Sequence, residues 1–203
     1  DDFLISSPTI TTSSGSLGLS PTGNSTVYLV FGSQAVNAST IQNWLDNTPD
    51  ERVGDLLQLG LANQANPISG ATGFPFAGIT ITASAQSNGQ LGASVASVGR
   101  LGGSAFNSLL IGAPGATDAN GANPGTGRAY LIYGGPSLTT VPNNTLDLDN
   151  LAGSGVNVVT FVNSATGSAT GRSVAEAGNV LGDGNLDIAI GAPTAGLTTT
   201  GNT

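Results

Sequence analysis

Short apolar runs separated by small polar residues extend along most of this chain of 203 residues. Three of these runs end in a proline: Asp2–Pro8, Ser108–Pro114 and Asp187–Pro193. Two others, which we call the Tyr runs, are near copies of each other: Val27-Tyr-Leu-Val-Phe-Gly32 and Ala129-Tyr-Leu-Ile-Tyr-Gly134. β-Branched and aromatic residues bounded by Gly and Pro are typical of strands. Near-continuous apolarity favours strands that are covered on both faces. We therefore predict a strand at each of the five runs.

Loops rich in Gly, Thr, Asn and Ser, residues 9–25 and 115–127, separate a proline-terminated run from the Tyr run that follows it. Each such pair predicts a hairpin with a long loop. The remaining strand-like stretches are Gly78–Thr82 and Val156–Val162, with weaker ones at Asp55–Gly60 and Leu146–Leu151.

A longer pattern occurs twice, at residues 92–114 and 171–193. Each copy starts with a small-residue strand of the form Gly-x-Ser-Val-Ala, continues through a polar turn into an apolar strand, and closes on Gly-Ala-Pro. Recurrence of a unit of this size is the signature of a repeat architecture. We therefore predict an all-β fold whose function belongs to the repeat array and its surface more than to one catalytic cluster.

Composition narrows the classes of function. The chain has no Cys and no His, so it lacks thiolate ligands, disulfides and the commonest general base. Its four basic residues, all arginines, make no basic patch for nucleic acid. No apolar run reaches the length of a membrane span. The net charge of −8 and the largely uncharged Ser/Thr/Asn/Gly surface suit an external bacterial protein. We expect a protein that is not an enzyme, is extracellular or on the cell surface, and binds no nucleic acid.

The duplicated unit resembles the FG-GAP repeat of the integrin alpha-subunit β-propeller and its bacterial relatives. The resemblance rests on the Gly-x-Ser-Val-Ala strands at 92–96 and 171–175, the Asn/Asp turn at 179–187, and Gly-Ala-Pro at 112–114 and 191–193. The Tyr runs match the Phe-Gly end of that repeat. The resemblance implies four-stranded blades, an extracellular location and a role in cell adhesion or surface recognition.

On this pattern the whole chain, 1–203, is one FG-GAP propeller segment. It divides into a partial blade over 1–90, a blade over 91–165 and a partial blade over 166–203, with an insertion at about 37–53 in the first unit. A closed propeller typically has about 4–8 blades, so this chain alone would form an incomplete ring. Either it is a fragment of a longer chain, or other copies complete its half-blades and build a fibre or ring.

The resemblance also implies calcium, because FG-GAP turns often bind Ca²⁺ through oxygen ligands. The ligand positions of the last turn hold Asn179, Asp183, Asn185 and Asp187. Leu181 takes one ligand position, so we expect a weak site. The alternative is a metal-free turn in which Asn and Asp side chains bind backbone N–H groups. In the middle turn Arg100 stands where the first ligand would be, and we expect its guanidinium to donate to nearby carbonyls.

These observations favour a non-enzymatic extracellular structural or adhesive module with Ca²⁺ in a supporting role. One alternative is a carbohydrate- or protein-recognition propeller, with loops 9–25 and 115–127 and the insertion that carries Trp44 as its binding rim. Another is an accessory propeller of a secreted hydrolase. Trp44 serves either to fix the insertion onto its blade or to recognise a ligand. Glycosidase chemistry has little support, because Glu176 has no obvious second acid beside it.

Overall fold

The computed structural model describes residues 3–7, 25–31, 77–83, 89–118, 120–123 and 125–195. Its strands are β1 (Phe3–Ser7), β2 (Thr26–Phe31), β3 (Ala77–Thr82), β4 (Ser94–Ser97), β5 (Leu109–Ala113), β6 (Arg128–Ile132), β7 (Thr145–Asp147), β8 (Val158–Val162), β9 (Ser173–Gly178) and β10 (Asp187–Gly191). Two short 3-10 turns, Pro136–Thr140 and Pro142–Asn144, complete the regular structure of this part of the chain. The prediction of an all-β protein is confirmed. The Asp55–Gly60 stretch and the 37–53 insertion with Trp44 lie outside the described residues.

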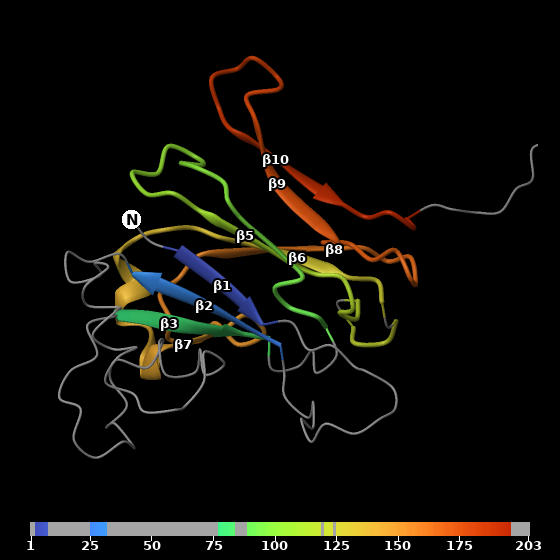
Figure 1. Ribbon diagram of the computed structural model, residues 1–203, viewed down its shortest axis with the longest axis horizontal. Helices are drawn as coiled ribbons and strands as arrows, with labels where there is room; N and C mark the ends of the chain where they lie inside the picture. The colour runs from blue at the N-terminus through green and yellow to red at the C-terminus, as the bar shows by residue number, and fades with distance from the viewer. Residues whose placement is uncertain are drawn as a thin grey trace, which may run out of the picture.

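The strands form layers that stack face to face (Figure 1). The first sheet has the order β1-β2-β3-β7, the second sheet has the order β4-β5-β6-β8, and β9 with β10 forms what we call the hairpin sheet. One apolar cluster, which includes Ile79, Ile81, Ile111 and Tyr130, lies between the first and second sheets. A second cluster joins the second sheet to Ile188 and other residues of the hairpin sheet. The second sheet therefore has an apolar cluster on each of its faces.

The strand register repeats as the sequence does. Ser94 of β4 pairs with Gly112 of β5, and 79 residues further on Ser173 pairs with Gly191 in the hairpin sheet. The two predicted long-looped hairpins are antiparallel pairs with matching registers: β1 pairs with β2, and β5 pairs with β6. Equal registers put equivalent residues on equivalent faces, because side chains alternate along a strand. Each position in one unit can therefore be compared with its counterpart in another.

One short strand crosses between units. The chain leaves β6, passes through the two 3-10 turns and adds β7 to the first sheet, where it runs parallel to β3. The backbone N–H of Leu148 then donates to the carbonyl of Thr82 at 2.8 Å. The weak Leu146–Leu151 stretch therefore begins as a strand, but in the sheet of the preceding unit.

The burial of a strand depends on how many sheets cover it as well as on its sequence. All five residues of β5 are buried, because sheets cover both of its faces. The residues of β10, which has nearly the same sequence, are only partly buried or exposed. The described residues cover β10 on one face only, where Ile188 and Ile190 pack on the second cluster.

Candidate interaction surfaces and the Asn179–Asp187 turn

The four residues expected to bind calcium lie together in the turn that joins β9 to β10, which projects from the body of the protein (Figure 1). The Asp187 carboxylate accepts hydrogen bonds from the backbone N–H groups of Val180 and Leu181 at 2.8 and 3.3 Å. The Asn179 side-chain oxygen accepts from the N–H of Asp183 at 3.1 Å. Side chains that bind backbone N–H groups stabilise such a turn without a metal.

Asp183 binds within the same turn, accepting from the backbone N–H of Asn185 at 2.9 Å and from its side-chain amide at 3.1 Å. The hydrogen bond from the backbone of Asn185 is the main reason that the pKa of Asp183 is lowered. Calcium prefers six to eight oxygen ligands, several of them charged. Two carboxylates already engaged by N–H groups fit that demand poorly. Among the described residues, no three His, Cys, Asp or Glu side chains form a group that could hold a metal ion.

The middle turn, between β4 and β5, differs from the expectation for Arg100. The Arg100 side chain is exposed, and it makes no hydrogen bond to the described residues. Instead, the turn is closed by backbone bonds: the N–H of Ser108 donates to the carbonyl of Gly99, and the N–H of Val98 donates to the carbonyl of Ser108. Among the described residues, no carbonyl accepts a hydrogen bond from this guanidinium, and the backbone closes the turn itself.

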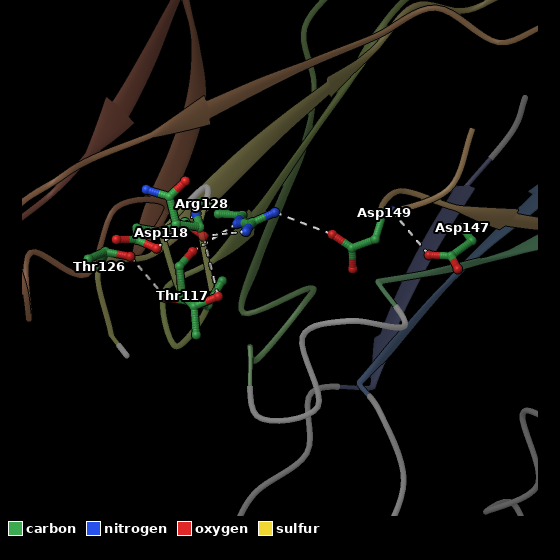
Figure 2. Close-up of polar contacts among 8 residues, drawn as sticks. Thr117, Asp118, Thr126, Arg128, Asp147 and Asp149 are labelled. Atoms are coloured by element: carbon green, nitrogen blue, oxygen red, sulfur yellow. Dashed lines mark hydrogen bonds and ion pairs between the residues drawn. The ribbon is translucent and has the colours of Figure 1, made fainter. Parts of the chain in front are cut away.

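A polar network anchors the long loop between β5 and β6 (Figure 2). The Arg128 guanidinium donates to the carbonyls of Thr117 and Asp118 at 2.8 and 2.6 Å, and it pairs with Asp149 at 3.3 Å. The Arg128 and Asp149 side chains are only 12 % and 10 % exposed. Asp149 is therefore held by a partner that lies 21 residues away in the sequence.

Asp118 shapes the tip of the same loop. Its carboxylate accepts hydrogen bonds from the backbone N–H groups of Asn120 and Ala122 and from the side-chain amide of Asn123. The bond from Ala122 is the largest of the causes that lower the pKa of Asp118, and burial opposes it. The loop that the sequence offered as part of a binding rim is thus held by its own side chains.

Tyr130 lies next to this network and faces the first cluster. Its ring is fully buried, and no described residue forms a hydrogen bond with its hydroxyl. Burial, followed by the negative charge of Asp149, raises the pKa of Tyr130 to about 12. Arg128 is near enough to oppose this shift, although its geometry to the phenol is not that of a hydrogen bond.

The contact between the second sheet and the hairpin sheet explains the Gly-x-Ser and Gly-Ala-Pro motifs. The Ser94 hydroxyl donates to the carbonyl of Gly171, the first residue of the next unit's motif, at 2.9 Å. A Cβ at Gly112 would overlap that same carbonyl oxygen. Only glycine allows this approach. The equivalent residues in the hairpin sheet are Ser173 and Gly191, and there the three atoms nearest to an added Cβ all belong to Ser173.

Repeat-equivalent positions differ sharply in exposure. Leu101, in the middle turn, is 9 % exposed and belongs to the second cluster. Its counterpart 79 residues later, Val180, is 71 % exposed. Ala175 and Ala189, which face away from the second sheet, are also exposed. The outer face of the hairpin sheet is therefore exposed at positions whose counterparts one unit earlier, Ala96 and Leu110, are partly or fully buried.

A cleft of about 720 Å³ opens between the first and second sheets. It lies at the ends of β2 and β6, with Phe31, Leu109 and Leu138 in its lining, and Phe106 at its rim is 49 % exposed. The 115–127 loop lies at the opposite ends of the strands, before β6. The predicted rim and the observed cleft are therefore at different ends, and loop 9–24 and Trp44 fall outside the described residues.

Within the described part of the chain, no helix combines the length and apolarity needed to cross a bilayer. A scan against protein-family models and a search of curated protein sequences each found no match. The repeat resemblance therefore rests on the residues quoted for it, and the geometry above is the basis for a functional proposal.

Proposed function

We propose that this protein is a non-enzymatic extracellular structural or adhesive module built from FG-GAP-type propeller blades, which assembles with other copies of itself into a fibre or ring. The observation that carries the proposal is the unequal burial of equivalent positions. Val180 is exposed where Leu101 is buried, although the two units share one register.

The blade assignment is supported by the strand order and register of the second sheet. It has four strands, with the Gly-x-Ser-Val-Ala strand β4 at one edge, followed by β5, β6 and β8. The units stack face to face through apolar clusters, and a hydroxyl-to-carbonyl bond at Ser94 joins one motif to the next. In arrays of this type each unit contacts its neighbours only, so an apolar face that no neighbouring unit covers favours association.

Self-association is supported by the surface that the hairpin sheet presents. Its outer face combines small residues with two exposed apolar side chains at the tip, Val180 and Leu181. Exposed apolar surface of this kind marks interaction sites. Contact of this face with a different face of another copy is heterologous, and such contacts generate rings or open filaments.

The extracellular location is supported by composition: the absence of Cys, the net charge of −8 and the uncharged polar surface. Calcium has a secondary place in the proposal. The Asn179–Asp187 turn is already held by its own hydrogen bonds, so we expect weak Ca²⁺ binding that adjusts assembly and is not required for it.

Multi-angle light scattering of the whole chain over a range of concentrations, with Ca²⁺ and then with chelator, tests this function. We expect a species larger than a monomer that grows with concentration. Replacing Val180 and Leu181 with Ser should shift the distribution toward monomer. A monomer at all concentrations, with or without Ca²⁺, would refute self-assembly.

A recognition propeller is the second candidate, and the cleft at the ends of β2 and β6 favours it. The volume of about 720 Å³ suits a small ligand, and the exposed ring of Phe106 at the rim suits stacking on an apolar face. A glycan array tests it, with Phe106→Ala and Trp44→Ala as variants. Specific binding that either substitution abolishes would support recognition, and no binding by the unsubstituted protein would refute glycan recognition.

A further inference from the structure

We infer that the free edge of β10, together with the adjacent face of β8, is an acceptor groove for an extended apolar strand from another polypeptide. The inference rests on the proposed assembly function and names the chemistry of the partner. We call this surface the acceptor groove and define it by β10, Val159 and Phe161.

Among the strands that the structure describes, β10 has one unpaired edge where its counterpart β5 has none. In the second sheet, β5 lies between β4 and β6, so both of its edges are paired. In the hairpin sheet β10 holds the position of β5, with the same register to its neighbour. Among the described residues, no strand pairs with its other edge. The acceptor groove is therefore an open sheet edge, which can pair with a strand from another chain.

The floor of the groove is an apolar face of β8. Val159 and Phe161 of β8 pair with Leu131 and Ala129, so they share the face that is turned toward the hairpin sheet. Val159 is 41 % exposed, and Phe161 is only partly buried.

The first sheet shows what covers such a floor. Ile79 and Ile81 of β3 hold the positions that correspond to Val159 and Phe161, since they pair with the equivalent residues of β2. Both isoleucines are almost completely buried, at 1 % and 0 % exposed. Tyr130 and Ile132 of β6 belong to the same cluster. Leu138 and Val141, from the segment after β6, also belong to this cluster, so β6 and that segment together cover the floor in the first interface. Among the described residues, no strand of the β6 type lies beside β10.

The chemistry of the partner follows from this comparison. It is an extended segment that pairs antiparallel with β10, as β6 pairs with β5. Its alternate side chains, at the positions of Tyr130 and Ile132, are large and apolar and lie on Val159 and Phe161. Main-chain hydrogen bonds supply affinity in strand addition, and alternate side chains supply specificity. The Tyr run at residues 129–134 has this pattern: it forms an extended strand, and its alternate side chains Tyr130 and Ile132 are large and apolar.

The probe is a labelled synthetic peptide with the sequence of Gly127–Gly134, titrated into the whole chain by fluorescence anisotropy. We expect saturable binding of the unmodified peptide. A peptide with Tyr130→Asn and Ile132→Asn should bind at least about tenfold more weakly, because those side chains face the floor. A peptide with Leu131→Asn alone should bind nearly as well as the unmodified one, because that side chain faces away.

Two protein variants supply the matched control. Val159→Asp places a charge in the floor and should weaken peptide binding by about tenfold or more. Val162 is equally exposed, at 45 %, but lies on the opposite face of β8, so Val162→Asp should leave binding unchanged. No binding of the unmodified peptide, or equal loss from both substitutions, would overturn the inference.

The outcomes separate this inference from the proposed function. Peptide binding by a chain that stays monomeric would support the groove and refute self-assembly. If the chain assembles with rising concentration but does not bind the peptide, self-assembly is supported and the acceptor groove is refuted.

Discussion

Gly112→Ala is the sharpest test of the contact between repeat units. The added Cβ would overlap the carbonyl oxygen of Gly171 and crowd the Ser94 hydroxyl. A backbone carbonyl has no rotamer to adopt, so the hairpin sheet must move away from the second sheet. Overpacking of this kind costs about 1–3 kcal/mol. Loss of the 2.9 Å bond from Ser94 to Gly171 adds about 1 kcal/mol.

The matched control is Gly191→Ala, the same substitution one unit later. Its Cβ would crowd only the Ser173 hydroxyl, which can rotate, and the next nearest atoms are 3.5 and 3.6 Å away. Neither glycine has a positive φ, so backbone strain does not separate the two. We expect an effect within about 0.5 kcal/mol for Gly191→Ala.

Differential scanning calorimetry measures the contrast. A loss of 1 kcal/mol lowers the melting temperature of a chain of this size by about 2–4 °C. Gly112→Ala should therefore melt about 2–12 °C lower than the unsubstituted protein by the overpacking cost alone. Equal melting temperatures for the two variants would refute the argument that the glycine is required by the next unit.

Three further predictions concern the polar network beside this interface. Arg128→Ala should lower the free energy of unfolding, measured in urea, by about 3 kcal/mol, because the largely buried Asp149 carboxylate loses its ion-pair partner. As a control, Arg172→Ala should change this free energy by less than about 0.5 kcal/mol, because Arg172 is exposed. The pKa of Asp118 is lowered from 3.8, so its stabilisation is complete above that value and is lost as pH falls through the lower folded pKa. Asp118→Asn should flatten this acid-side loss of stability in urea titrations, and an unchanged pH profile would contradict the assignment. The pKa of Tyr130 is raised from 10.0 to about 12, so stability is complete below pH 10 and falls as pH rises from 10 toward 12. Tyr130→Phe should remove the late phase of tyrosinate absorbance. It should leave stability at neutral pH equal or higher, because the hydroxyl makes no hydrogen bond within the described part of the chain. A clear loss of stability at neutral pH would contradict this.

The strands could be predicted from local pattern because each is a compact apolar run between Gly and Pro. The Tyr runs and the proline-terminated runs became β2, β6, β1, β5 and β10. Their antiparallel pairing followed from the order of runs along the chain. The Leu146–Leu151 stretch, which begins as β7, could not be assigned to a sheet from sequence. Its parallel pairing with β3 depends on where the first unit lies in space.

The polar contacts were harder to predict, for a similar reason. Asp149 and Arg128 are separated by 21 residues, and nothing local marks them as partners. The hydrogen bonds of the Asn179–Asp187 turn can be predicted from sequence, since Asx bonds form between near neighbours. Whether calcium binds there stays a prediction. The exposure of Val159 and Val180 depends entirely on whether another layer is present, so no pattern within a strand could reveal it.

The crossing of β7 into the first sheet has a mechanical consequence. The segment that follows β6 in the second sheet pairs as β7 with the edge strand β3 of the first sheet, and the chain then returns to the second sheet as β8. Pulling the two layers apart therefore requires the β3–β7 ladder to break at the same moment as the apolar cluster between them. This pairing between β3 and β7 couples the two sheets into one cooperative unit. The amide hydrogens of β3 and β8 should therefore exchange with solvent in the same opening event. Among the described residues, no strand from another sheet pairs with the hairpin sheet. We therefore expect the hairpin sheet to open first.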